Sequence, residues 1–458
     1  MGKGMGKKLI IIIVVAFALR LININQSLWL DEAIGAIAAR DFTYSEIITR
    51  FIIADNHSPG YYLLLKSWTN IFGFSEMALR SLSVVFGVLT VYLVYKTNKV
   101  AALLLATSQL HVYYSQEARM YAIAGFFATL AMLSFVEALK SNKNSHWLYF
   151  SFSVLGLMLT DYMPIFLLPV FPVYVFIKKR KAFTRLVISF TPILLLGVLW
   201  LPTIVTQIEN YSAVPDSFLF GGATLKQAML LVMKFVSGRI SFEPKLVYYS
   251  LVGLASIPVF IALRQSLKNK KALLFWLWFA LPLCLGFLAS FIFPAFSYFR
   301  YIYVLPAFYI IISLGRKILL YPILAFSVVS LLIYYNDEAQ QREQWRQAVE
   351  YVEMGESATS IALFEFPDPF ASYSWYAQGR VDARGATNSI LADSPETELK
   401  TRSLISNKYK IFYFEYLRDV SDPGRLVEKV IFEEGFLESA KTAEFVGVGA
   451  ITIYEKTN

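Results

Sequence analysis

The sequence has few charged residues, one cysteine and three histidines. Asp, Glu, Lys and Arg make up 16% of its 458 residues, compared with about 25% in soluble domains. The hydrophobic share of 57% and the mean hydropathy of +0.52 therefore exclude an ordinary soluble enzyme. A single cysteine, Cys284, excludes an internal disulfide and a multi-cysteine metal site. Its apolar neighbours favour a small buried side chain. With three histidines, a histidine-rich metal centre is not expected.

The charge is divided unevenly along the chain. Residues 1–335 hold 29 Lys and Arg against 12 Asp and Glu, whereas residues 336–458 hold 13 against 21. The basic residues of the first part lie in short clusters between apolar runs, which is typical of a membrane protein. We therefore expect no nucleic-acid partner. The division predicts a transmembrane domain over residues 1–335 and a soluble, acidic domain over residues 336–458.

Eleven apolar runs approach the length of about 17–25 residues that a helix needs to cross a bilayer. No A-x-A-like cleavage site follows the first run, which favours a retained signal-anchor over a cleaved signal peptide. The fold class predicted is a polytopic α-helical membrane protein with about 11 transmembrane helices. The runs lie near residues 8–24, 77–95, 100–114, 121–139, 146–160, 163–177, 186–206, 246–263, 272–292, 301–315 and 318–335.

The positive charges between these runs indicate an orientation. With the N-terminus in the cytoplasm, 18 of the 29 basic residues of the first part fall in the inner segments, and Glu137 is the one acidic residue there. Short cytoplasmic loops carry such an excess of Lys and Arg. We therefore expect a multi-pass protein of the cell membrane. The loops 25–76 and 207–245 and the C-terminal domain would be extracytoplasmic.

The outer loop 25–76 begins with an acidic pair, Asp31 and Glu32, just after Trp29. Acids at a helix start stabilise the helix; alternatively, one is a general base and its neighbour binds a metal or orients an acceptor. A capping box at Thr43 precedes apolar residues at helical spacing, which predicts an amphipathic interfacial helix. A break at residues 55–62 and a second helix carrying Lys66 follow.

The next outer loop is dense in polar and aromatic side chains. Tyr114, Glu117, Arg119 and Tyr121 lie within residues 111–122. This pattern is typical of an interfacial aromatic belt with a Glu–Arg pair, or of a second wall of a site in which Arg119 meets an anion. Asp161, in a turn between two short runs, is either a loop cap or a member of that site.

Arg300 opens a span at the outer surface, beside several aromatic residues. It either snorkels to the interface or clamps a phosphate, for which the planar guanidinium is well suited. Acids and cations are thus predicted at one membrane depth, next to lipid, which suits a substrate with a lipid tail and an anionic head. The acids are Asp31, Glu32 and Asp161, and the cations are His57, Lys66, Arg119 and Arg300.

The C-terminal domain alternates amphipathic and short apolar segments. Strands are expected at residues 360–366, 410–416 and 446–454, and helices near 341–354, 396–406 and 423–431. This alternation predicts a small α/β domain. It contains no phosphate-binding glycine loop, metal-ligand spacing or nucleophile elbow, so an accessory role is expected.

The ordered motifs resemble GT-C superfamily membrane glycosyltransferases of the protein-mannosyltransferase and aminoarabinose-transferase type. The resemblance covers most of residues 20–335, and the segment at Trp345 and Arg346 also resembles bacterial and archaeal members. It is carried by WLDE at 29–32, NHSPGYYLLLK at 56–66, FGFSEMALR at 72–80, YYSQEARMYA at 113–122 and the pair Arg300-Tyr301.

The resemblance implies a polyprenyl-monophosphate-linked sugar as donor, used on the extracytoplasmic face, and an acceptor that is a protein, a glycolipid or a glycan. It implies that Asp31 is the catalytic carboxylate, with Glu32 beside it. Some relatives bind a divalent metal near these acids and others need none, so the cofactor is left open. Donor-phosphate contacts are expected from His57, Lys66, Arg119, Arg300 and Tyr301, and other substrate contacts from Tyr61, Tyr62, Tyr114, Glu117, Tyr121 and Asp161.

The chain departs from the relatives at two positions. Relatives often have Pro where this chain has Ser58, and His where it has Asp161. The chemistry predicts an inverting transfer: a lipid phosphate leaves without a general acid, while Asp31 takes the acceptor proton. The alternative is a transporter or flippase of a lipid-linked sugar. Such proteins tend to show inverted repeats and a midplane polar site, which this sequence lacks. A structural receptor would leave the ordered motifs unexplained.

Overall fold

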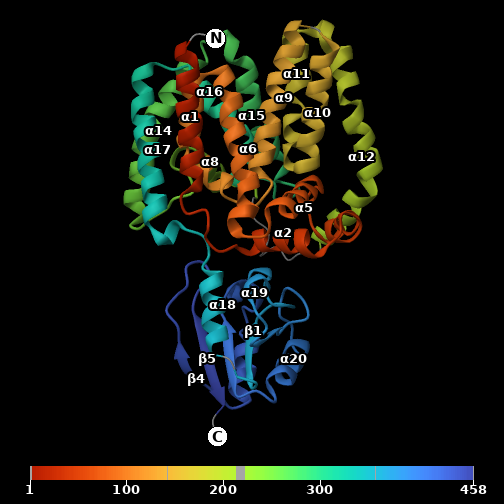
Figure 1. Cartoon of the computed structure of the whole chain (residues 1–458), viewed down its shortest axis with the longest axis vertical. Helices are drawn as coiled ribbons and strands as arrows, with labels where there is room; N and C mark the ends of the chain where they lie inside the picture. Colours follow the sequence, from red (N-terminus) through yellow and green to blue (C-terminus); the bar gives the residue numbers. More distant parts are fainter. Residues whose placement is uncertain (1–2, 142, 213–221, 356, 457–458) are drawn as a thin grey trace. The chain divides into compact units, whose positions relative to one another are not determined.

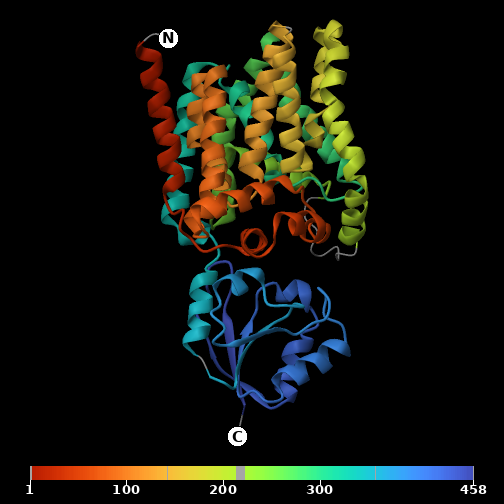
Figure 2. The same cartoon turned by 45° about the vertical axis from the view of Figure 1, so that its right-hand side comes forward.

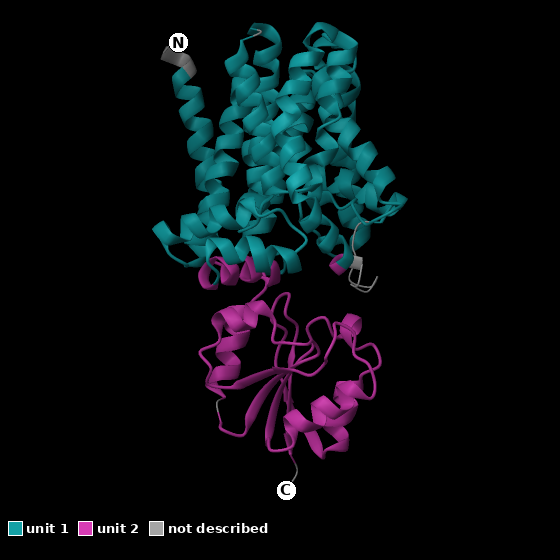
Figure 3. Cartoon of the chain, turned by 90° about the vertical axis from the view of Figure 1, so that its right-hand side faces the viewer, with its two compact units in different colours: residues 1–24, 42–209, 220–340 teal, residues 25–41, 210–219, 341–458 magenta. Residues whose placement is uncertain are grey.

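The computed structural model describes residues 3–141, 143–212, 222–355 and 357–456. The chain divides into two compact units, coloured separately in Figure 3. The first, which we call the membrane unit, comprises residues 1–24, 42–209 and 220–340. The second, the C-terminal unit, comprises residues 25–41, 210–219 and 341–458. Helix α2 (Leu30–Asp41) thus belongs with the C-terminal residues, whereas the sequence placed it in the outer loop of the transmembrane domain.

Long apolar helices build the membrane unit, in which they lie side by side as a bundle (Figures 1 and 2). Within the described residues, six helical stretches are long and apolar enough to cross a membrane. They coincide with six of the predicted runs and confirm the polytopic helical class. These helices are α6 (Glu76–Thr97), α9 (Tyr121–Ser141), α12 (Phe183–Ser212), α14 (Lys245–Ser266), α15 (Leu273–Ala289) and α17 (Lys317–Asn336).

The helices at the other five predicted runs are not among these six stretches, so the number of spans stays a prediction. They are α1 (Lys3–Leu21), α7 (Lys99–Thr107), α8 (Gln109–Ser115), α10 (Asn144–Thr160), η2 (Met163–Leu167), α11 (Val170–Lys178), η6 (Tyr298–Val304) and α16 (Leu305–Ile312). Connecting helices are η3 (Arg180–Ala182), α13 (Leu225–Ser237), η5 (Lys270–Ala272) and η7 (Glu338–Gln340).

The outer face of this bundle is apolar. Val198 and Leu199 on α12 are 71% and 78% exposed, as expected for side chains that contact lipid rather than water. Cys284 on α15 is also exposed, so the prediction of a buried cysteine was wrong. Apolar neighbours indicate burial only in a protein surrounded by water. In a membrane helix, the side chains that face lipid are as apolar as those in the core.

Short helical turns follow α2 along the chain. The helices α3 (Tyr44–Glu46), η1 (Ile47–Phe51) and α4 (Ile52–Ala54) run on from one to the next, and the Thr43–Glu46 capping box is formed. The helix α5 (Gly60–Phe72) begins where Ser58 Oγ donates to the carbonyls of Met158 and Leu159. A Cβ on Gly60 would lie 2.4 Å from the Leu159 oxygen. Glycine therefore allows the start of α5 to pack against the end of α10.

A five-stranded mixed sheet forms the centre of the C-terminal unit, in the order β2-β1-β3-β5-β4. The strand β1 pairs in parallel with β2 and β3, whereas β5 is antiparallel to β3 and β4. The strands are β1 (Ser360–Phe364), β2 (Asp382–Gly385), β3 (Lys410–Phe414), β4 (Phe436–Lys441) and β5 (Ile451–Lys456). The helices are α18 (Trp345–Met354), α19 (Ala371–Tyr376), α20 (Glu396–Ile405), α21 (Arg418–Ser421) and α22 (Leu426–Glu433).

These elements confirm the α/β class of the domain. The three predicted strands are present as β1, β3 and β5, and α18, α20 and α22 lie at the predicted helices. The strands β2 and β4 were missed because they lie at the edges of the sheet, where side chains are exposed and polar. Alternate residues of the central strand β1 face opposite sides: Ala362 and Phe364 pack in one core, and Ile361 and Leu363 in the other.

Candidate active site

A hydrogen-bonded pair stands in the break between α4 and α5. His57 Nδ1 lies 3.0 Å from one carboxylate oxygen of Asp55 and 3.2 Å from the other. Burial would raise the pKa of Asp55, but the hydrogen bond with His57 and the nearby positive charge of Arg119 outweigh it and lower the pKa. Asp55 therefore stays ionised and holds the imidazole by its Nδ1 side. Sequence reasoning treated Asp55 only as part of the helix break.

Arg119 contacts the other side of the same ring. Its Nη2 lies 3.2 Å from His57 Nε2. A guanidinium can only donate hydrogen bonds, so Nε2 is the acceptor in this contact and Nδ1 carries the proton that Asp55 accepts. The structure thus joins Asp55, His57 and Arg119 into a chain of two hydrogen bonds, although Arg119 is 62 residues away in sequence.

Gln207, at the end of α12, fixes the backbone around this pair. Its Nε2 donates to the carbonyls of Ile52, Asp55 and His57, over 2.7, 2.8 and 3.2 Å. The Tyr162 hydroxyl donates to its Oε1 over 3.1 Å. Sequence reasoning missed Gln207. The signal that could have found it was a polar residue at the end of an apolar run.

Asp161 shares the electrostatic surroundings of this chain. Its Oδ1 accepts the backbone N–H of Met163 over 3.1 Å, so it does cap the turn after α10. Burial raises its pKa, and that N–H, the neighbouring His57 and the charges of Arg300 and Arg119 offset only part of the increase. Asp161 is therefore both a cap and a neighbour of three predicted phosphate ligands.

Arg300 and Tyr301 lie in η6 but differ in their surroundings. The Arg300 guanidinium, which is half-buried, donates to the carbonyl of Pro294. Tyr301 is fully buried, with its ring centroid 5.3 Å from that of Phe296 and its hydroxyl against Gly286 of α15. The structure therefore places Arg300 near the Asp161 cluster, and Tyr301 inside the helix packing.

A wall of aromatic rings connects α8 and α9 with η6. The Tyr114 ring centroid lies 5.2 Å from that of Tyr121 and 6.5 Å from that of Tyr298. Tyr121 also contacts Phe299, at 5.8 Å. Glu117 is buried close to Tyr114. The segments 113–122 and 298–304, far apart in sequence, thus lie side by side.

The predicted ligands on α5 separate into two groups. Tyr61 and Tyr62 are buried and contact each other edge to face, with ring centroids 5.2 Å apart. The Tyr62 hydroxyl faces Asp55. Lys66 lies further along the helix, with its ammonium 5.6 Å from the ring centroid of Tyr44.

The acidic pair Asp31 and Glu32 begins α2 and belongs to the C-terminal unit. Asp31 is half-buried, whereas Glu32 is fully buried, and the Trp29 backbone N–H donates to a Glu32 oxygen over 3.4 Å. The two acids therefore differ in environment, as expected for neighbours that diverge by about 100° on a helix. Within the described residues, no group of three or more His, Cys, Asp and Glu is arranged to hold a metal ion.

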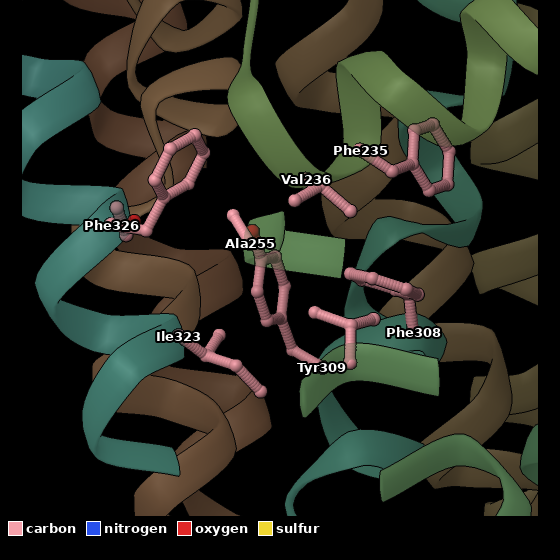
Figure 4. A pocket seen from close by; sticks show the side chains of 9 residues that line it. Phe235, Val236, Ala255, Phe308, Tyr309, Ile323 and Phe326 are labelled. Carbon is pink, nitrogen blue, oxygen red and sulfur yellow. The ribbon is translucent and has the colours of Figure 1, made fainter. Parts of the chain in front are cut away.

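Two hollows lie away from these residues. The one in Figure 4, among Phe235, Phe308, Tyr309 and their neighbours, has a volume of about 10 Å³, which is enough for about one water molecule. The other, beside strand β2, measures about 610 Å³, and its charged side chains Asp382, Arg384 and Lys408 are paired with one another. Neither hollow contains a predicted site residue.

Comparisons with known proteins concern the fold of the chain. Residues 56–208, a third of the chain, match the family model described as dolichyl-phosphate-mannose-protein mannosyltransferase. The crystal structure of ArnT from Cupriavidus metallidurans in the apo state superposes with a TM-score of 0.58. That comparison covers 98% of this chain and 97% of that one, at 9% sequence identity. The chain has the fold of a GT-C membrane glycosyltransferase.

A second structure of ArnT from Cupriavidus metallidurans, bound to undecaprenyl phosphate, has a TM-score of 0.49 at 10% identity, covering 99% of this chain and 98% of that one. No curated protein matches the sequence. The predicted resemblance to the GT-C superfamily is confirmed. The roles of the individual site residues stay predictions.

Proposed function

We propose that this GT-C chain is an inverting glycosyltransferase that moves a sugar from a polyprenyl-monophosphate carrier to an acceptor on the extracytoplasmic face. The observation that carries the proposal is the hydrogen-bonded chain of Asp55, His57 and Arg119, with Arg300 and Asp161 around it. Arg119 is fixed in place by His57, and a positioned guanidinium beside a second one suits a phosphate. The family matched by residues 56–208, dolichyl-phosphate-mannose-protein mannosyltransferase, favours the same class of donor.

The reaction needs one bond made and one broken at the anomeric carbon. The acceptor oxygen attacks this carbon from the face opposite the carrier phosphate, and the bond to the phosphate oxygen breaks with its electron pair. Arg119 and Arg300 stabilise the charge that develops on the departing phosphate, which is the kind of electrostatic stabilisation that preorganised donors provide. Asp31 accepts the acceptor's proton. The sugar carbon is inverted in the product.

The donor assay tests this proposal directly. Purified protein in lipid nanodiscs is incubated with radiolabelled sugars on dolichyl or undecaprenyl monophosphate, with candidate acceptors, and free polyprenyl phosphate is measured. We expect release with the wild type and a loss of at least about 10³-fold in Asp31→Asn, with donor binding retained. Asp41→Asn, at the other end of α2, is the matched control. A flippase would move the carrier lipid without releasing the phosphate, and full activity in Asp31→Asn would refute the assignment.

The proposal includes the face of the membrane on which the reaction takes place. The Lys and Arg clusters favour a cytoplasmic N-terminus and an extracytoplasmic C-terminal unit. Asp419, an exposed residue of that unit, provides a labelling position. In a Cys284→Ser background, Asp419→Cys should react with a membrane-impermeant maleimide in intact cells. Labelling only after lysis would place the unit in the cytoplasm.

A further inference from the structure

The segment that leads to Asp31 is bound by the residues that open the C-terminal domain. Gln26 accepts the backbone N–H of Arg342 over 2.8 Å, and its amide donates to Gln341. Ser27 Oγ donates to the Glu343 carbonyl. Arg346 Nη2 donates to the carbonyl of Asn25 over 3.4 Å. Residues 25–27 and 341–346, more than 300 positions apart, therefore run along each other within one compact unit.

The next residues are held by the domain's aromatic side chains. The backbone N–H of Leu28 donates to the Tyr376 hydroxyl over 2.7 Å. Leu30 packs on the core cluster that contains Trp345 and Phe370. Beyond it, α2 packs on α19, and the Arg40 guanidinium lies 4.8 Å from the ring centroid of Trp375. The acids at the start of α2 are thus anchored on both sides.

A second carboxylate and a phenol of the same unit, Glu343 and Tyr416, pair with each other, and Tyr416 is near enough to Asp31 to feel its charge. Trp345 Nε1 donates to one oxygen of Glu343 over 2.7 Å, and the Tyr416 hydroxyl donates to the other over 3.3 Å. Burial first, and then the charges of Glu343 and Asp31, raise the pKa of Tyr416. Gly447, at φ +74°, approaches so closely that a Cβ there would lie 2.5 Å from Glu343 Cγ. The Glu343 side chain is therefore confined next to Tyr416.

We propose that the C-terminal domain is part of the catalytic apparatus, in which Tyr376 and Tyr416 are positioning residues for the Asp31 carboxylate. This inference rests on the proposed function, in which Asp31 takes the acceptor proton. Tyr376 fixes the backbone of the segment, and Tyr416, whose hydroxyl donates to Glu343, holds that second carboxylate within the electrostatic surroundings that Tyr416 shares with Asp31. A general base must be held in a defined geometry to act. The domain that the sequence suggested as an accessory would provide that geometry.

Two conservative variants of the full chain test the proposal. Tyr376→Phe removes the acceptor for the Leu28 N–H, and Tyr416→Phe removes the hydroxyl but keeps the ring that packs 5.0 Å from Trp345. Tyr409→Phe, at an exposed tyrosine of the same unit, is the control. The readouts are kcat per titrated donor-binding site, KM for dolichyl-phosphate mannose, and hydrogen exchange of residues 25–41.

We expect kcat to fall about tenfold in both variants, with KM unchanged, since the loss concerns the attacking step. Exchange of residues 25–41 should rise about fivefold in Tyr376→Phe only, while β1 and β3 stay protected. A kcat within about twofold of the control in both variants would overturn the proposal. If the wild type transfers no sugar, the proposed function fails. Hydrogen exchange alone then tests whether Tyr376 anchors residues 25–28, and unchanged exchange in Tyr376→Phe would overturn that anchoring.

Discussion

The two units differ in the sign of charge that predominates among their buried side chains. In the membrane unit, the buried bases are Arg20, Arg80, Arg119 and Lys234, against the acids Glu117 and Asp161. In the described part of the C-terminal unit, the buried acids are Glu32, Glu353, Glu365 and Asp422, against the single base Arg342. The difference follows the net charge of the two parts of the sequence, and it extends to buried side chains.

The partners of these charges explain how each sign is tolerated. Arg20 donates to the carbonyls of Ala16 and Ala106 over 2.7 and 3.2 Å, and Lys234 donates to those of Arg239 and Ile240. Glu353 instead accepts the backbone N–H groups of residues 378 and 379. Buried charges need hydrogen bonds, and here Arg20 and Lys234 find backbone carbonyls whereas Glu353 finds backbone N–H groups. Under the proposed function, the basic unit suits the phosphate and the acidic unit supplies the proton acceptor.

The most severe test of this division replaces the central base of the membrane unit. Arg119→Lys keeps the charge but loses the fork that donates to His57 and, under the proposed function, to the donor phosphate. We expect kcat to fall about 10²-fold or more, as for the loss of one preorganised transition-state donor. Arg50→Lys, at an exposed arginine of η1, is the matched control. Activity within about threefold of the wild type would remove Arg119 from the phosphate site.

A smaller effect is expected from replacing Asp55, the acid that pairs with His57 in the basic membrane unit. Asp55→Asn offers His57 Nδ1 an amide, which can donate and so displaces the ring proton to Nε2, against Arg119. We expect kcat to fall about tenfold. NMR of ¹⁵N-labelled histidine should show the proton on Nδ1 in the wild type and on Nε2 in the variant. An Nε2-protonated wild type would contradict the hydrogen-bond chain.

The C-terminal unit provides the third test, through stability. Burial raises the pKa of Glu365 to about 9, although the Tyr413 hydroxyl donates to it. The folded form therefore keeps a proton that the unfolded chain releases above its ordinary pKa of 4.5. The free energy of unfolding should fall as pH rises from about 4.5 to 9. Glu365→Gln should remove this pH dependence, in which the total decrease in the free energy of unfolding is on the order of a few kcal/mol.

Hydrogen exchange of β1 and β3, corrected for intrinsic rates, measures that slope in the full chain. Glu350→Gln, at an exposed position of α18, is the control and should leave it in place. If the wild type and Glu365→Gln lose protection in parallel between pH 5 and pH 9, Glu365 is not the buried acid responsible.

Local patterns in the sequence predicted most of the helices and the central strands of the sheet. Apolar runs gave the helices of the membrane unit, the Thr43–Glu46 box gave a helix start, and alternation gave β1, β3 and β5. These signals are local, because periodicity and capping involve residues within one or two helical turns. Side chains that carry chemistry, such as Arg119 and Arg300, could also be identified, since charge at a membrane surface is visible in the sequence.

Only the tertiary structure decided which groups meet. The pairing of His57 with Arg119 joins positions 62 apart, and the binding of residues 25–28 by 341–346 and Tyr376 joins positions more than 300 apart. Such contacts depend on how helices and strands pack, which no short pattern encodes. The exposure of Cys284 was undetermined for a related reason: hydropathy reports the preference of a side chain, and lipid satisfies that preference as well as a protein core does.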